Sequence, residues 1–224
     1  MEVLDKGFVN LVNFMGGDLA VVASARVSNG ITPEEASKGE EADQKLINFL
    51  MRNRHGTPFE HSIFTFFVKC PIFVAREWQR HRIGSYNEVS GRYTEFQPEF
   101  YIPSAFRQPG STNKQGSEPL NDPKADEWLK LGFEKWSQLA YDEYQFLLKQ
   151  GLAKEMARMV LPLNLYTQYY WTVNARSLMN FLNLRAAEDA QWEIRQYALA
   201  IKDIFKEKMP QTFGAWEGNG YLAP

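Results

Sequence analysis

Residues 61–82 read HSIFTFFVKCPIFVAREWQRHR, and this stretch decides which fold the sequence predicts. Its first part alternates in polarity as a half-buried β-strand does. The side chains on one face of that strand are Phe64, Phe66, Val68 and Cys70. Pro71 then stands where a helix can begin, because the first helical position needs no N–H donor. In that helix Arg76 and Arg80 are four residues apart and share a face.

Helical and extended patterns alternate along the rest of the chain. We expect a second strand at 164–173, which reads NLYTQYYWTV. Helices are expected at 18–28 with Asp18 as the cap, and at 43–54, 71–82, 129–147, 156–161, 177–185 and 190–209. Residues 107–124 contain one apolar side chain, Leu120, and are expected to form an exposed loop. The sequence thus predicts a single α+β domain over residues 1–224, with a small, largely antiparallel sheet flanked by helices.

The composition is that of a folded globular chain. Hydrophobic residues make up 44% and aromatic residues 14% of the 224 residues, which excludes wholesale disorder. The chain has no run of about 18 apolar residues, so no transmembrane helix is expected. The N-terminal MEVLDKGF lacks the basic and apolar segments of a signal peptide. We therefore expect a cytoplasmic protein that does not contact a membrane.

The net charge is close to zero, but the basic residues are unevenly placed. Twenty-five Lys and Arg against 27 Asp and Glu give −2, without the basic excess that a general nucleic-acid binder usually shows. Within residues 76–92, however, four arginines accompany His81. Such a local cluster fits a small anionic ligand better than it fits a nucleic acid.

Residue types that often carry catalysis or bind metals are few. Cys70 is the single cysteine, so it forms no intrachain disulfide and no cysteine-based zinc site. Its place on the apolar face of a strand predicts a buried, unreactive thiol. His55 and His61 are six residues apart, which is not the i, i+4 spacing of a helical zinc pair, and no metal site is expected. A G-x-G-x-x-G or Walker-type loop is also absent from the sequence.

Residues 80–93 combine cations, hydroxyls, an amide and a carboxylate in the order RHRIGSYNEVSGRY. This stretch resembles the signature of flavin-dependent thymidylate synthases, RHRxxSxNxxSxR. All of its specified positions match, namely Arg80, His81, Arg82, Ser85, Asn87, Ser90 and Arg92. Further blocks extend the likeness over most of the chain: LDKGFV, ARVS, TPFEH, PIFVAR, EFYIP, ARMVLPLNLYT and WTVNARSLMNFLNLR.

The resemblance implies an enzyme that makes thymidylate (dTMP) by reductive methylation of deoxyuridylate (dUMP). One carbon comes from 5,10-methylenetetrahydrofolate and the electrons come from NADPH through FAD, with release of tetrahydrofolate. The flavin carries the hydride chemistry, while the protein supplies orientation and electrostatics. The resemblance assigns Arg185 to the uracil edge, where its charge activates the ring without a thiol. It places His55 near the flavin ring, where folate or nicotinamide stacks.

The resemblance further implies the residues of two binding sites. Those expected to bind dUMP are Glu77, Trp78, Gln79, Arg80, Glu88, Val89, Ser90, Gly91, Arg92, Arg158 and Arg185. Those expected to bind FAD are Ser28, Thr57, Glu60, Arg80, His81, Arg82, Glu88, Asn174, Ala175, Arg176 and Asn180. Ser90 is assigned to positioning the nucleotide, with a covalent role of its hydroxyl as the alternative.

Two residues depart from the family pattern. Glu77 stands where a glutamine is usual, and we expect its carboxylate to face ribose hydroxyls or to pair with Arg80. Asp189 stands where many members carry a histidine near the flavin, so no flavin contact is assigned to it and weaker FAD retention is expected. The family works as a homotetramer whose active sites combine several subunits, which implies the same assembly for this chain.

Two other functions remain open on the sequence alone. A non-catalytic module would use the arginine–tyrosine segment as a stacking platform for a nucleotide or RNA. Such a protein would be colourless and would bind oligonucleotides in a salt-dependent way. The second alternative is a flavoprotein that oxidises NADPH without methyl transfer.

Overall fold

An antiparallel sheet forms the centre of the protein, of which the computed structural model describes residues 1–111 and 116–224. The strand order is β1-β2-β3-β7-β4, and each neighbouring pair is antiparallel. The strands are β1 (Glu2–Val3), β2 (Gly7–Met15), β3 (Ile63–Pro71), β4 (Ser85–Glu88) and β7 (Tyr166–Asn174). The two strands that the sequence predicts are β3 and β7, which pair with each other throughout. The expected α+β class and antiparallel sheet are confirmed, whereas β2 and β4 were not predicted.

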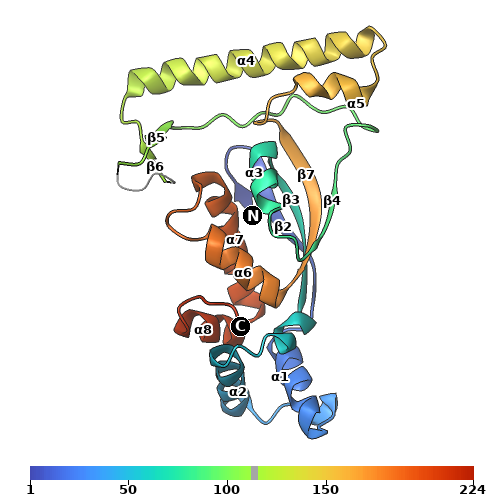
Figure 1. Ribbon diagram of the computed structural model, residues 1–224, viewed down its shortest axis with the longest axis vertical. Coiled ribbons are helices and arrows are strands. Elements are labelled where there is room, and N and C mark those ends of the chain that lie inside the picture. Colours follow the sequence, from blue (N-terminus) through green and yellow to red (C-terminus); the bar gives the residue numbers. More distant parts are fainter. Residues whose placement is uncertain (112–115) are drawn as a thin grey trace.

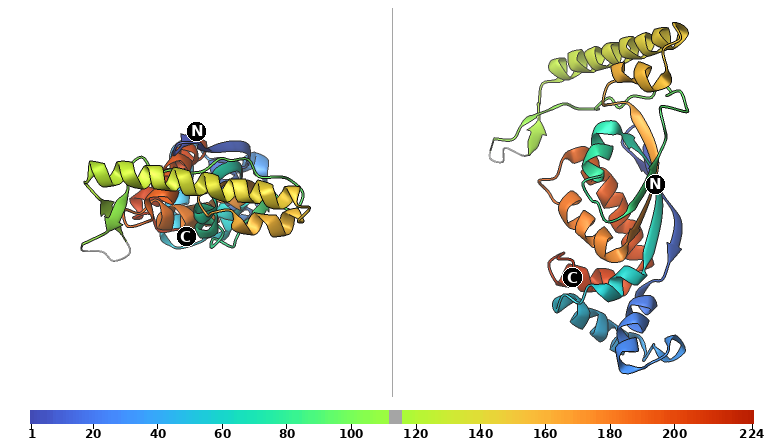
Figure 2. Two further views of the ribbon diagram at one scale, coloured as in Figure 1. Left: turned by 90° about the horizontal axis from the view of Figure 1, so that it is seen from above. Right: turned by 45° about the vertical axis from the view of Figure 1, so that its right-hand side comes forward.

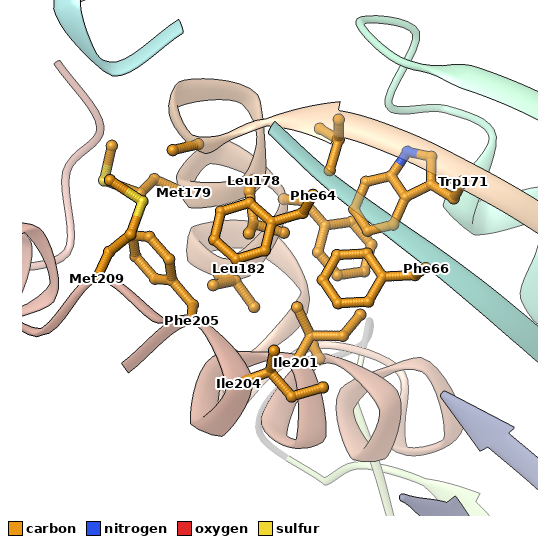
Figure 3. Packing of buried hydrophobic residues seen from close by; sticks show 14 of the residues in the cluster. Phe64, Phe66, Trp171, Leu178, Met179, Leu182, Ile201, Ile204, Phe205 and Met209 are labelled. Carbon is orange, nitrogen blue, oxygen red and sulfur yellow. The ribbon is translucent and has the colours of Figure 1, made fainter. Parts of the chain in front are cut away.

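Three helices cover one face of this sheet (Figure 1). They are α3 (Ile72–Trp78), α6 (Ala175–Arg185) and α7 (Trp192–Lys208). The alternation in β3 turns Phe64 and Phe66 inward, where Phe66 stacks on Trp171 of β7 at a centroid distance of 5.7 Å. Residues of α6 and α7, Leu182 and Ile201 among them, complete this core (Figure 3). Each large apolar side chain buried here contributes about 1.5–3 kcal/mol, so the core fixes both helices against the sheet.

The opposite face of the sheet carries no helix in the described part of the chain (Figure 2). Phe8, Phe67 and Tyr170 form an aromatic row there, with successive ring centroids 5.4 and 5.0 Å apart. Tyr170 is 46% exposed. An aromatic row on an uncovered sheet face is an apolar surface available for contact with another molecule.

At one end of the sheet, the first and last parts of the chain pack together. The helices are α1 (Asp18–Arg26), α2 (Glu40–Arg52) and α8 (Pro210–Gly218), with the short 3-10 helices η1 (Val27–Asn29), η2 (Pro33–Glu35) and η3 (Thr57–His61). Helix α8 was not predicted. Asp18 was expected to cap its own helix, α1, but it does not. Its carboxylate oxygens instead accept the main-chain N–H groups of Gln211 and Thr212, each at 2.9 Å, and so cap α8.

At the other end lies the long helix α4 (Pro123–Lys149), followed by α5 (Lys154–Ala157) and η4 (Arg158–Val160) (Figure 1). The expected loop 107–124 is in part a hairpin of β5 (Arg107–Pro109) and β6 (Ser117–Pro119), because main-chain pairing and the ion pair of Arg107 with Glu193 order it. Residues 112–115 of that expected loop lie outside the described residues. Although α4 is long, none of the described helices is apolar enough along its length to cross a membrane.

Candidate active site

Arg185 lies in the last turn of α6, where that helix meets the end of α3. Its Nε donates a hydrogen bond to Nε2 of His81 at 3.0 Å. Its Nη2 donates to the main-chain carbonyl of Glu77 at 3.4 Å, and its Nη1 lies 3.5 Å from the Glu77 carboxylate. Three contacts to the segment 77–81 therefore fix the direction in which this guanidinium points.

His81 is neutral at physiological pH. Its burial lowers its pKa from 6.5 to about 4, and the positive charge of Arg185 lowers the pKa in the same direction. Because Nε2 accepts a hydrogen bond from Arg185, the single ring proton resides on Nδ1. His81 thus orients Arg185 as a neutral acceptor and adds no positive charge.

Glu77 pairs with Arg185, so the expectation that it pairs with Arg80 is wrong. Helix α3 ends at Trp78, short of the expected end at residue 82, and Arg80 therefore lies beyond the helical face that carries Glu77. Oxygen Oε2 of Glu77 is buried and has no hydrogen-bond partner within the described residues. Its ion-pair partner, Nη1 of Arg185, lies 3.5 Å away without forming a hydrogen bond, so this oxygen can still accept one from a ligand.

A cavity of about 540 Å³ lies beside these residues. Its lining consists of Arg76, Glu77, Arg80, His81, Leu184 and Arg185. A second cavity, of about 1000 Å³, shares Glu77, Leu184 and Arg185 and extends past Asp189 towards Arg107. Arg185 and Glu77 thus stand where two cavities join, with space for a ligand on either side.

A second group of the residues that are expected to bind dUMP lies around the turn that follows β4. The Ser90 hydroxyl accepts the main-chain N–H of Arg92 at 3.3 Å. The Nε of Arg92 lies 2.9 Å from the carboxylate of Glu155, a residue of α5. A Cβ at Gly91 would lie 2.4 Å from the Phe96 ring and 3.0 Å from Cδ of Arg158, so only glycine permits this close packing.

Glu88 connects this group to the end of α3. Its two carboxylate oxygens accept from Nε2 of Gln79 at 3.1 Å and from the Thr167 hydroxyl at 2.5 Å. The indole of Trp78, in contrast, is fully buried and stacks on Phe181. A contact between Trp78 and a nucleotide is therefore restricted to its main chain.

Most of the expected FAD residues gather at the opposite end of α6. Arg176 forms an ion pair with Glu60 at 2.6 Å, and Gly56 makes room for it, because a Cβ there would lie 2.4 Å from Nε of Arg176. Asn174 caps α6 by accepting the N–H of Ser177 at 2.8 Å. Ala175 is buried, Thr57 and Asn180 are exposed, and Ser28 is exposed in η1, which follows α1.

The expected FAD residues are thus divided between the two ends of one helix. Helix α6 has 11 residues and so is about 16 Å long. The group with Arg176 lies at its N-terminus, whereas His81 contacts its C-terminus and is followed by the exposed Arg82. His55 is exposed and contacts the edge of Phe49 at a centroid distance of 5.7 Å.

The expectation of a buried thiol is confirmed. Cys70 is fully buried, and its Sγ lies 3.6 Å from the hydroxyl of Tyr169. Burial raises the pKa of this thiol far above its ordinary value, so the nucleophilic thiolate is not formed. The residue is a core side chain and cannot reach a substrate.

Some residues of the site were not predicted. Glu155 contacts Arg92, and Leu184 lines the smaller cavity beside Arg76, which belongs to the arginine cluster that the sequence predicts for an anionic ligand. The position of Glu155 three residues before Arg158 was the available signal, since residues at that spacing share a helical face. No sequence pattern marks Leu184, which lines the cavity only because α6 ends beside α3.

The arginines at both ends of α6, beside an antiparallel sheet and an open cavity, give this α+β protein a surface that suits an anionic ligand. The family described as thymidylate synthase complementing protein (Thy1) matches residues 10–211, and the chain belongs to this family. A flavin-dependent thymidylate synthase of Thermosipho africanus is 54% identical over 215 residues, which cover 96% of this chain and 92% of the relative. That of Thermus thermophilus is 54% identical over 218 residues, covering 97% and 78%.

A solved structure has the same fold throughout. It is the UMP/dUMP methylase PolB from Streptomyces cacaoi bound with 5-Br dUMP, with a TM-score of 0.91 and 36% sequence identity. The similarity covers 100% of each chain. The uncovered sheet face and the separate α4 are therefore features of a fold that is shared with a nucleotide-binding enzyme.

Proposed function

We propose that this protein methylates dUMP to dTMP. In the balanced reaction, 5,10-methylenetetrahydrofolate gives one carbon, NADPH gives a hydride, and a proton completes the products dTMP, tetrahydrofolate and NADP⁺. The observation that carries this proposal is the guanidinium of Arg185, fixed between His81 and Glu77 at the junction of two cavities. The 54% identity to thymidylate synthases over 96% of the chain supports the same reaction.

Arg185 activates the uracil ring in this proposal. Its N–H groups donate to a uracil carbonyl, and its charge stabilises negative charge at N3 and that carbonyl, which makes the ring carbon more nucleophilic before it attacks. The Arg185 side chain is 19% exposed, so its electrostatic effect is stronger than that of an arginine in bulk water. Because Cys70 is buried, the activation does not involve a thiol adduct.

Arg92, Arg158 and Ser90 bind the phosphate of dUMP in this proposal. A phosphate monoester carries about two negative charges at neutral pH, and arginine is suited to its oxygens. Ser90 positions the group through its hydroxyl, which lies within 3.3 Å of the main-chain N–H of Arg92. Glu88 ends β4, and the next residue, Val89, donates its main-chain N–H to the Gln168 carbonyl at 2.9 Å, so both place this turn against β7.

The N-terminal end of α6 fits FAD. Gly56 leaves room for Arg176, and the N-terminus of an 11-residue helix attracts phosphate groups. Arg176, Ser28, Thr57 and Asn180 would hold the cofactor there, with Arg80, His81 and Arg82 at the other end of the site. When bound, FAD supplies the hydride chemistry. Asp189 adds a carboxylate to the larger cavity, which supports weaker FAD retention.

We further propose that NADPH and folate approach from the side of His55. This imidazole is exposed at the start of the segment that leads to η3, next to the Arg176 group. An exposed aromatic ring at such a place is suited to stacking on a planar ligand.

The active enzyme is a homotetramer in this proposal. The two ends of α6 carry separate parts of the site, and two apolar surfaces are uncovered in one subunit. The first is the aromatic face of the sheet, and the second lies on α4. This helix exposes Trp128, Leu139 and Phe146, which are spaced by 11 and 7 residues and so lie along one line of the helix. Burial of such surfaces between subunits would bring the parts of the site together.

One assay tests the proposed function against its alternatives. The purified protein is mixed with FAD, NADPH, dUMP and methylenetetrahydrofolate, and dTMP is measured. We expect a yellow protein whose colour is bleached by NADPH and which forms dTMP. Bleaching without dTMP would support the oxidase. A colourless protein with salt-dependent oligonucleotide binding would support the non-catalytic module. A parallel reaction with UMP tests whether the substrate range of PolB applies to this chain.

A further inference from the structure

Glu155 of α5 contacts Arg92 beside the expected phosphate ligands, although no sequence motif assigns it to the site. We propose that Glu155 sets the affinity for dUMP, because its carboxylate occupies the phosphate position in the nucleotide-free subunit. Binding of dUMP then requires this carboxylate to move away. This inference rests on the proposed function, since it takes Arg92 and Arg158 as the phosphate ligands.

The geometry places a carboxylate among groups that suit a phosphate. Nε of Arg92 lies 2.9 Å from Oε2 of Glu155, the distance of a charge-assisted hydrogen bond. Nε of Arg158 donates to the main-chain carbonyl of the same Glu155 at 3.4 Å. Both arginines thus converge on one residue, and the Ser90 hydroxyl lies beside the main chain of Arg92.

The carboxylate is also able to leave. The side chains of Arg92 and Glu155 are 59% and 51% exposed, so Glu155 can rotate into solvent without crossing the core. Exposed ion pairs are weak. Competition by such a pair therefore reduces phosphate affinity by at most about fivefold.

Helix α5 does not depend on this ion pair for its position. Ala157 is fully buried. The neighbouring Lys154 lies 3.5 Å from the carboxylate of Glu95 and donates to the carbonyl of Tyr93 at 3.4 Å. A substitution at Glu155 that keeps its size should therefore leave the fold and the arginines in place.

The test is Glu155→Gln, with Glu95→Gln as the matched control. Both variants remove one negative charge from an exposed ion pair on the same part of the surface, so a general change in electrostatic attraction affects both. The dissociation constants of dUMP and of inorganic phosphate are measured by calorimetry on the FAD-loaded protein. We expect Glu155→Gln to bind dUMP about two- to fivefold more tightly than the wild type, with less than half of that gain for Glu95→Gln.

The outcomes separate this inference from the proposed function. If Glu155→Gln binds inorganic phosphate more tightly but does not bind dUMP, the competition between Glu155 and phosphate is supported and the proposed function is overturned. If the wild type binds dUMP and Glu155→Gln binds it no better than Glu95→Gln, the proposal that Glu155 competes with the phosphate is wrong. The proposal is also wrong if neither the wild type nor either variant binds dUMP or phosphate, because the site then does not accept a phosphate. Thermal unfolding of each variant checks that the fold is retained.

Discussion

Three arginines that are expected to meet ligands are each held by a glutamate. Glu77 pairs with Arg185, Glu60 with Arg176 and Glu155 with Arg92. Each pair reduces the positive charge that an anion meets, and the pair of Glu77 with the largely buried Arg185 also limits the movement of that side chain. The binding residues themselves are predictions from the sequence through the resemblance. Their partners could not be predicted, because an ion pair between distant segments leaves no local pattern.

Arg185→Lys should reduce the turnover of dUMP at least about 100-fold. Lysine cannot keep the contacts of the planar guanidinium to His81 and Glu77 at the same time, so its charge would no longer be fixed at the uracil edge. Steady-state formation of dTMP provides the measurement. Arg52→Lys is the matched control, because Arg52 also lies in the last turn of its helix. Turnover within about threefold of the wild type would remove Arg185 from the reaction.

His81 should make the stability of the protein depend on pH between about 6.5 and about 4. Its pKa is lower in the folded state than the ordinary 6.5, so within that window the unfolded chain binds more protons. The free energy of unfolding therefore falls as the pH decreases from 6.5 towards 4.

His81→Gln keeps a hydrogen-bond acceptor but cannot titrate. We expect its free energy of unfolding to change less between pH 7 and pH 5 than that of the wild type, as measured by urea denaturation. His61→Gln, at an exposed histidine, serves as the control. An identical change in the wild type and His81→Gln would show that His81 does not contribute.

At the level of elements, helix α6 organises the site. Its first turn carries Arg176 and its last turn carries Arg185, and each end contacts a different segment of the chain. The sequence predicted a helix at 177–185 from its periodicity and missed only its start. The core packing of Leu178, Leu182 and Phe181 against the sheet explains why both ends are held in place.

Predictions of elements succeeded where the pattern was strong and local. The alternation in β3 and β7 was sufficient to predict both strands. Helix α3 is shorter than expected because the chain turns after Trp78 to bring His81 back beside α6. Helix α8 was missed because its cap, Asp18, is supplied from the other end of the chain.

Asp18→Ala should therefore destabilise the protein by about 1–2 kcal/mol, although Asp18 lies far from α8 in sequence. The change removes the acceptor for Gln211, and for both the main chain and the hydroxyl of Thr212. Urea denaturation measures the loss. Glu41→Ala, at an exposed carboxylate paired with Lys45, is expected to cost less than about 0.5 kcal/mol. Equal losses in the two variants would contradict the capping role.

At the level of the whole molecule, a single subunit carries the two groups of expected site residues at opposite ends of α6. It also leaves two apolar surfaces uncovered, the aromatic face of the sheet and the apolar line of α4. Substitution of one exposed apolar residue of α4 tests whether another subunit covers the apolar line of this helix. Leu139→Lys places a charge on the line shared with Trp128 and Phe146, so we expect the proposed tetramer to dissociate into smaller species. Sedimentation equilibrium gives the mass.

Glu134→Lys is the control for this substitution. It introduces the same lysine about 140° around the helix axis from Leu139, away from the apolar line. We expect this variant to keep the mass of the wild type. A wild-type protein that sediments as a single subunit, or a Leu139→Lys protein of unchanged mass, would contradict the proposed use of α4.

The most direct measurement concerns the carbon that the reaction transfers. The wild-type protein is incubated with FAD, NADPH, dUMP and methylenetetrahydrofolate that carries an isotopic label in its methylene group, and the nucleotide products are analysed by mass spectrometry. We expect dTMP with the label in its methyl group, and none when NADPH, FAD or the folate is left out. A protein that consumes NADPH but forms no labelled dTMP would contradict the proposal that this chain is a dUMP-methylating enzyme.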